Sequence, residues 1–177
     1  MPDFKDLDGP VEKLNRLGRE EARAALLACC GSGRWAAAVE ALRPFWDVGQ
    51  LLGIAGRVWR ELGPEDWLEA FRAHPKIGES KAAAETGARS REWSEGEQSG
   101  ARLASDETLA ALASANREYE ERFGFIFIVC ATGRGAEEML ALLRARMAND
   151  PETELRVAAD EQWRITELRL KKFLNVK

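Results

Sequence analysis

The single histidine of the chain, His74, occupies a position that suits acid-base chemistry. Pro75 follows it, and a residue before proline is driven out of the helical region of backbone space, so a helix through Trp67 and Phe71 should end at His74. The carbonyl groups at a helix C-terminus favour the charged imidazolium, which predicts a raised pKa and an acid near neutral pH. A lone histidine can equally be structural, and the position of His74 leaves both interpretations open.

A carboxylate that could partner this imidazole is Glu97, in the segment Trp93-Ser94-Glu95-Gly96-Glu97-Gln98. The Ser-x-x-Glu pattern of Ser94 and Glu97 is typical of a capping box, in which the two side chains satisfy backbone amides at a helix start. The alternative is that Glu97 contacts His74, holds the ring and raises its pKa through opposite charge. The pattern is common, and the sequence does not decide between these roles.

Arg169 is a candidate anion-binding group. The apolar residues Leu168 and Leu170 flank it, which places it near the edge of a buried helix face. Most arginines on such helices extend into solvent. The alternative is an arginine that binds a carboxylate, because the planar guanidinium donates two parallel hydrogen bonds to the two oxygens.

The sequence predicts neither a metal site nor a bound cofactor. His74 has no second histidine to join it, and the cysteines lack the Cys-x-x-Cys spacing of zinc ligands. The glycine-rich turn Gly133-Arg134-Gly135 lacks the Lys-Ser/Thr of a phosphate-binding loop, so we interpret it as an ordinary helix start.

Helix-period patterns dominate the chain and predict one all-α domain over residues 1–177. Gly31 and Pro64 are typical helix-end and helix-start residues. The expected helices cover residues 19–30, 35–42, 47–62, 64–74, 94–104, 106–122, 135–148 and 152–173. The small and polar residues of 76–92 predict a long loop, and loops of that length are usually functional or disordered.

One segment breaks the helical pattern. Residues 123–130 are apolar, aromatic and β-branched, which is typical of a buried strand. No second run could pair with it, and an unpaired buried strand would leave backbone groups unsatisfied. We therefore expect a bundle of about eight helices with one buried extended segment near 125–130, whose free amides and carbonyls could bind a ligand.

The composition excludes several classes of protein. The 177 residues carry 26 Lys and Arg against 30 Asp and Glu, a net charge of −4 with the basic residues scattered, which excludes a nucleic-acid-binding stripe. No apolar stretch approaches the roughly 20 residues that span a membrane, and the start of the chain is not a signal peptide. The three cysteines fit a reducing compartment, so we expect a cytoplasmic protein without a membrane segment.

Four motifs, taken together, resemble one known family. They are His74-Pro75-Lys76-Ile77-Gly78, the stretch from Ser94 through Glu97-Gln98 to Gly100, the run from Tyr119 through Phe123-Gly124-Phe125 to Gly133, and Ile165-Thr166-x-Leu168-Arg169-Leu170. Each motif alone is weak. Their order and spacing resemble the 2-oxo-4-hydroxy-4-carboxy-5-ureidoimidazoline (OHCU) decarboxylase family of urate breakdown, and the resemblance covers nearly the whole chain.

The resemblance implies a cofactor-free decarboxylase that converts OHCU to (S)-allantoin and carbon dioxide, the last step of the pathway from urate. It implies that His74 is the catalytic histidine and that Glu97 is its partner. The substrate-binding residues that it implies are Pro75, Ser94, Gln98, Arg169 and the segment of Phe127, Ile128, Val129, Cys130 and Ala131. It also implies a homodimer.

The chemistry of this reaction agrees with such residues. Loss of carbon dioxide leaves an electron pair that the adjacent C=N of the ring can accept, so the enzyme has to orient the substrate and place one proton. We expect Arg169 to hold the anionic substrate and His74 to protonate one face. Two other classes stay open, namely a non-catalytic all-α ligand-binding module with the same pocket and a structural bundle in which the six tryptophans are core.

Overall fold

The computed structural model describes residues 9–76 and 105–176, and all regular structure in these two ranges is helical. The helices are α1 (Glu12–Asn15), α2 (Arg19–Cys30), α3 (Gly33–Glu40), α4 (Val48–Glu61), α5 (Pro64–Arg72), α7 (Asp106–Phe123), α8 (Ala136–Arg146) and α9 (Pro151–Leu174). These eight helices, with no strand in either described range, confirm the all-α prediction. The expected helix 94–104 and nearly all of the expected loop 76–92 lie outside the described residues.

Local signals set most helix ends where the sequence predicted them. Gly31 adopts a left-handed conformation with a φ of 88° and ends α2 at Cys30, as expected. The Ser32 hydroxyl accepts a hydrogen bond from the Trp35 amide at 3.2 Å, so α3 begins at Gly33 rather than at Trp35. The sequence did not predict α1, because a helix of 4 residues is too short to show a periodic pattern.

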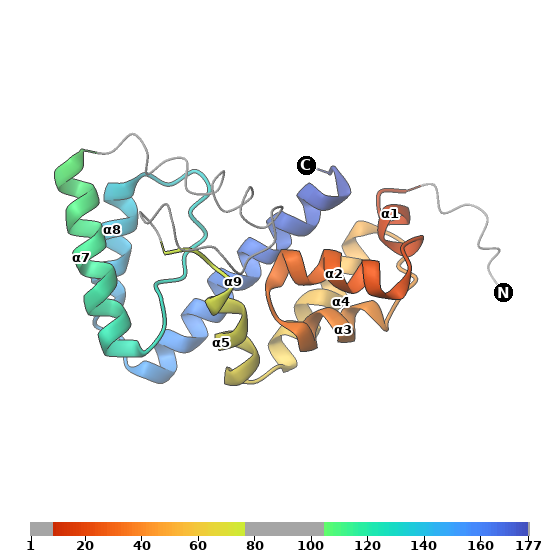
Figure 1. Cartoon of the computed structure of the whole chain (residues 1–177), viewed down its shortest axis with the longest axis horizontal. Coiled ribbons are helices and arrows are strands. Elements are labelled where there is room, and N and C mark those ends of the chain that lie inside the picture. Colours follow the sequence, from red (N-terminus) through yellow and green to blue (C-terminus); the bar gives the residue numbers. More distant parts are fainter. Residues whose placement is uncertain (1–8, 77–104, 177) are drawn as a thin grey trace.

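Helix α9 is 24 residues long and runs through the middle of the molecule (Figure 1). On one side α2, α4 and α5 pack against it, and α3 joins α2 and α4 there. On the other side α7 and α8 pack against each other (Figure 1). The side chains of α9 can therefore meet groups from both halves of the bundle.

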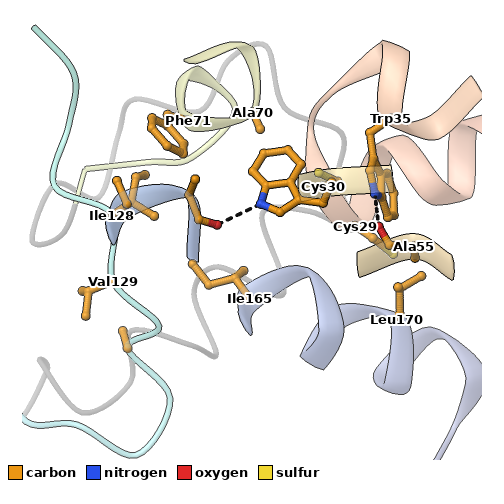
Figure 2. Close-up of a cluster of buried hydrophobic side chains, with 14 of the residues drawn as sticks. Cys29, Cys30, Trp35, Ala55, Ala70, Phe71, Ile128, Val129, Ile165 and Leu170 are labelled. Carbon is orange, nitrogen blue, oxygen red and sulfur yellow. Dashed lines mark hydrogen bonds between the residues drawn. The ribbon is translucent and has the colours of Figure 1, made fainter. Parts of the chain in front are cut away.

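The tryptophans of the core keep their indole N–H groups hydrogen-bonded. Trp35 is fully buried and donates to the carbonyl of Ala55 at 3.0 Å (Figure 2). Trp59 of α4 donates to the carbonyl of Ala159 in α9 at 2.9 Å. These bonds remove the cost of burying a polar N–H, so both rings contribute their full apolar area to the core.

The chain between α7 and α8 is the buried irregular segment that the sequence predicted. After Gly124 it returns along the α7–α8 pair, so it has to cover the length of a helix in few residues (Figure 1). Residues 125–131 form no strand, and most of their side chains are buried. Phe125 and Phe127 meet Tyr119 of α7 with ring centroids 5.9 and 5.3 Å apart. Aromatic packing on α7 therefore replaces pairing with a second strand.

Side chains satisfy two backbone groups of this segment. Arg146 Nη1 of α8 donates to the carbonyl of Ile128 at 2.7 Å. The amide of Cys130 donates to Glu161 Oε2 of α9 at 2.7 Å. A buried segment without a partner strand needs such bonds, because an unpaired backbone group in the interior costs about 1–3 kcal/mol.

Candidate active site

Helix α5 ends beside His74, as the sequence predicted. The last helical residue is Arg72, and the His74 amide donates to the carbonyl of Phe71 at 3.1 Å before Pro75 turns the chain away. The residue as a whole is half-buried. Its Nε2 is buried and has no hydrogen-bond partner among the described residues. A buried ring nitrogen without a partner marks His74 as more than a satisfied core histidine.

The junction of α2 and α3 lies directly against this end of α5. A Cβ atom added to Gly31 would lie 2.6 Å from Ala73 Cβ and 3.2 Å from the carbonyl oxygen of Ala70. The Gly33 amide also donates to Glu69 Oε2 at 3.2 Å. The residue before His74 is therefore held by close contact with the glycine that follows Cys30.

We expect Gly31→Ala to destabilise the fold by about 2–4 kcal/mol, because it adds a steric clash of about 1–3 kcal/mol to a left-handed backbone penalty of about 1 kcal/mol. Gly124→Ala is the matched control, since Gly124 has a φ of 77° but no atom within 4 Å of an added Cβ. Urea denaturation of both variants separates the two effects. Equal losses of stability would show that the close approach at Ala73 is unimportant.

Helix α9 presents three buried polar side chains to this region. Gln162 and Thr166 are 0% exposed and Arg169 is 2% exposed, and their spacing puts them on one face of the helix. Gln162 Nε2 donates to the carbonyl of Cys30 and to Thr166 Oγ1, both at 3.2 Å. The Arg169 side chain lies in the interior, whereas most arginines on such helices extend into solvent. Its binding of a carboxylate stays a prediction.

The electrostatics of His74 differ from the helix-end expectation. Burial and, after it, the positive charge of Arg169 lower the pKa of His74 to about 3, whereas an interaction with the Gln162 side chain opposes this. The expected increase of the pKa was therefore wrong for these surroundings. A helix dipole contributes about 0.3–1 kcal/mol, and removing an imidazolium from water next to a guanidinium costs more. With this lowered pKa we expect His74 to be neutral at pH 7.

Because His74 is the only histidine, NMR can follow its titration without assignment. We expect the imidazole signals to stay those of the neutral ring from pH 8 down to about 5, since the pKa is lowered to about 3. The urea-unfolded chain is the control and should titrate near the ordinary value of about 6.5. A folded-state midpoint at or above 6.5 would show that a carboxylate such as Glu97 outweighs burial and Arg169.

The lowered pKa of His74 also makes the stability of the fold depend on pH. Between pH 6.5 and about 3 the unfolded chain binds a proton at His74 and the folded chain does not, because the folded pKa lies at about 3. The contribution of His74 to stability is therefore complete above pH 6.5 and declines as the pH falls through this window.

Cys30 belongs to the same buried region but is not a nucleophile. Burial raises the pKa of its thiol to about 12, although Thr166 and the charge of Arg169 act in the opposite direction. A thiol with this pKa is protonated at neutral pH and is chemically inert. Cys30 therefore forms part of the wall behind His74.

An apolar wall completes the region. Figure 2 shows Ala70 and Phe71 of α5, Ile128 and Val129 of the irregular segment, and Ile165 of α9 gathered in one buried cluster. Phe71 also meets the ring of Phe125 at 5.4 Å between centroids. Low-polarity walls strengthen electrostatic interactions, so a charged ligand next to Arg169 would be held strongly.

The structure brings together some of the predicted site residues. His74 and Arg169 act on each other electrostatically, and Pro75 follows His74. Ser94, Glu97 and Gln98 lie outside the described residues, so their roles stay predictions. In the predicted backbone site, Phe127, Ile128, Val129 and Ala131 are buried and Cys130 is half-buried. The Cys130 amide already donates to a protein carboxylate.

Sequence reasoning missed Gln162, the buried amide next to His74. Its signal was present, because Gln162 falls in the same helical register as the apolar core positions Ala158 and Ile165. A polar residue at a core position needs a hydrogen-bond partner or a function. Thr166 was noted only as part of a family motif.

A second buried polar network lies behind the irregular segment. The Glu154 carboxylate is 0% exposed and accepts hydrogen bonds from Arg146 Nε and Asn149 Nδ2, both at 2.7 Å, and from the Tyr119 hydroxyl. Burial, followed by the bond to Glu154, raises the pKa of Tyr119. Since Arg146 also binds the carbonyl of Ile128, this network fixes the irregular segment between α7 and α8.

Metal-ligand groups and membrane-spanning helices are both absent from the part of the chain that the structure describes. No group of three or more His, Cys, Asp or Glu side chains is placed to hold a metal ion there. No helix in the described ranges is long and apolar enough to cross a membrane.

Comparisons with known proteins agree on one family. The family model described as OHCU decarboxylase matches residues 15–171. A 2-oxo-4-hydroxy-4-carboxy-5-ureidoimidazoline decarboxylase from Amia calva is 35% identical over 137 residues, which are 76% of this chain and 77% of that protein. A protein of the same name from Haloferax volcanii is 29% identical over 90% of this chain and 93% of its own length.

The uric acid degradation bifunctional protein TTL of Arabidopsis thaliana is 40% identical over 150 residues, or 84% of this chain. The chain spans 46% of the length of that protein. The fold also matches a crystal structure of OHCU decarboxylase in the presence of (S)-allantoin, with a TM-score of 0.74 and 37% identity over 90% of this chain and 99% of that one. The chain therefore belongs to the OHCU decarboxylase family, the carboxy-lyases of urate degradation.

Proposed function

We propose that this chain decarboxylates OHCU to (S)-allantoin and carbon dioxide, with Arg169 as the binding site of the substrate anion and His74 as the proton-transfer group. The observation that carries this proposal is the half-buried imidazole of His74 next to the buried guanidinium of Arg169, whose charge lowers the pKa of His74. An imidazole next to a buried cation suits an anionic substrate that has to exchange a proton.

Arg169 suits the carboxylate of the substrate. It is 2% exposed, so an anion that reaches it leaves water and gains a strong charge-assisted hydrogen bond. Holding the carboxylate perpendicular to the ring also aligns the breaking C–C bond with the C=N group that accepts its electrons. Orientation of this kind can contribute several kcal/mol to catalysis, up to about 7–11 in well-oriented systems.

The reaction needs only the substrate anion and one proton. Carbon dioxide leaves C4, the electrons of the broken bond form a C4=C5 double bond, and the C5=N electron pair takes a proton from solvent at nitrogen. The resulting enol then loses its 4-hydroxyl proton while C5 gains a proton, which yields the C4 carbonyl of allantoin. The face on which C5 receives this proton decides between (S)- and (R)-allantoin.

A neutral His74 suits the second step. It can accept the hydroxyl proton of the enol and, as the imidazolium, return a proton to one face of C5. In this proposal Glu97 stabilises the imidazolium while it exists, which offsets the unfavourable effect of Arg169. Pro75, Ser94, Gln98 and the segment 127–131 are the proposed further substrate contacts.

A coupled assay tests the proposal directly. Urate oxidase and hydroxyisourate hydrolase produce OHCU, and circular dichroism follows the appearance of optically active allantoin with and without this chain. The spontaneous reaction has no chiral environment and yields racemic allantoin, so a growing (S)-allantoin signal is the expected result. Spontaneous rates and a racemic product in the presence of the chain would refute the proposed function.

The alternative of a non-catalytic ligand-binding module predicts a different result in the same assay. Such a module would slow the loss of OHCU in proportion to its own concentration and would not turn over. Membership of a carboxy-lyase family gives no support to the purely structural bundle.

We also propose that the chain acts in the cytoplasm and forms a homodimer. None of the three cysteines, all of which lie within the described residues, forms a disulfide, which is compatible with a reducing compartment. Light scattering after size exclusion measures the mass in solution against the 19.7 kDa of one chain, and a monomer at all concentrations would contradict the dimer.

A further inference from the structure

The side-chain amide of Gln162 can adopt only one orientation. Its Nε2 donates to the carbonyl of Cys30 at 3.2 Å and to Thr166 Oγ1 at 3.2 Å. The Thr166 hydroxyl uses its own proton on the carbonyl of Gln162 at 2.9 Å, so Oγ1 is an acceptor toward the amide. A flipped amide would place its oxygen against two acceptor oxygens, so these hydrogen bonds identify which atom of the amide is the oxygen.

This orientation leaves Gln162 Oε1 buried without a hydrogen-bond partner among the described residues. A buried amide oxygen of this kind costs about 1–3 kcal/mol unless a donor reaches it. His74 Nε2 is likewise buried without a hydrogen-bond partner among the described residues. Oε1 can only accept a hydrogen bond and an imidazole nitrogen can donate one, so the two unsatisfied atoms are complementary.

Backbone contacts bring the segments that carry these two side chains close together. Gln162 is bound to the carbonyl of Cys30, and the next residue, Gly31, is in close contact with Ala73 immediately before His74. The Gln162 side chain also acts on the imidazole by raising its pKa, against the larger effects of burial and Arg169. The contact joins α9 to the end of α5 through the junction of α2 and α3.

We propose that Gln162 is a positioning residue whose Oε1 accepts the Nε2–H of His74, so that the neutral ring is held in one tautomer with Nδ1 as its free base. A neutral imidazole has only one N–H, and that proton is then committed to Gln162. The proton-accepting nitrogen is therefore Nδ1. The catalytic consequence rests on the proposed function, whereas the tautomer is a property of the free protein.

Two variants separate this role from structural anchoring. Gln162→Leu and Gln162→Glu both lose the Nε2 donors that bind Cys30 and Thr166, but only Gln162→Glu keeps an acceptor oxygen. ¹⁵N-imidazole NMR of the single histidine reads out the tautomer, the hydrogen bond of its proton and its pKa. The coupled assay supplies kcat and KM separately.

In the wild-type protein we expect the Nε2–H tautomer with a slowly exchanging, hydrogen-bonded proton. Gln162→Leu should lose that proton signal and lower kcat by about tenfold, the loss of one hydrogen bond, with KM changed by less than about twofold. Gln162→Glu should keep the signal and raise the pKa of His74, because a carboxylate replaces the amide.

An Nδ1–H tautomer in the wild-type protein would overturn the proposal. So would a wild-type imidazole signal in both variants, which would make Gln162 an anchor for Cys30 only. If Gln162→Leu does not fold, the tautomer of His74 in the wild-type protein and the pKa of His74 in Gln162→Glu still test the proposal. Absence of turnover by the wild-type protein would refute the proposed function and leave the NMR result valid.

Discussion

Replacing His74 by asparagine removes the excess of (S)-allantoin and lowers the rate of its formation by about 10²- to 10⁴-fold, the usual contribution of a positioned acid-base group. Asparagine has a similar length and remains polar, but it cannot take up and return a proton. The helical fold should persist, because His74 follows the last hydrogen bonds of α5 and lies outside the regular helix.

Arg72→Gln is the control for this variant. Arg72 is exposed at the end of the same helix, and its replacement changes charge near the site without touching the buried ring. Circular dichroism in the far ultraviolet checks the fold of both variants, and the coupled assay checks the stereochemistry of the product. Undiminished (S)-allantoin formation by His74→Asn would disprove the role of His74.

Replacing Glu154 by glutamine destabilises the fold by about 3–5 kcal/mol, because it leaves Arg146 in the interior without its counter-charge. The arginine side chain is 11% exposed and the carboxylate 0%, so water cannot compensate. Asn149 and Tyr119 donate hydrogen bonds to the Glu154 carboxylate. The NH₂ group of a glutamine would face one of these donors and could not accept its hydrogen bond. Urea denaturation measures the loss.

Glu152→Gln is the matched control, two residues earlier on the same helix. Glu152 pairs with Arg156 at 2.7 Å, but the two side chains are 76% and 70% exposed. Exposed pairs of this kind contribute about 0–1 kcal/mol. A loss for Glu154→Gln no larger than that of Glu152→Gln would show that the buried network does not stabilise the protein.

The Glu154 variant also probes the link between this network and the site. Arg146 holds the carbonyl of Ile128, so a displaced arginine loosens the segment that we propose as a substrate contact. We expect kcat/KM for OHCU to fall under conditions in which the variant is still folded. The distal position of Glu154 makes this an effect on positioning rather than on chemistry.

Features that depend on neighbouring residues could be predicted from the sequence. Gly31 ends α2 because glycine tolerates a positive φ, and Pro75 leaves His74 at the end of α5 because proline restricts the residue before it. The segment near 125–130 was identified from its apolar run and from the lack of a partner strand. The order of weak motifs over the chain was sufficient to identify the family.

Features that depend on desolvation and on distant contacts required the tertiary structure. The sequence predicted a raised pKa for His74 from its own helix, but burial and Arg169, which comes from α9, lower it. Gln162 is distant in sequence from His74, and folding brings their segments together where Gly31 lies against Ala73 and Gln162 binds Cys30. Helix ends are local, so sequence alone determined where His74 stands, whereas the protonation state of His74 is set by the groups that folding brings to it.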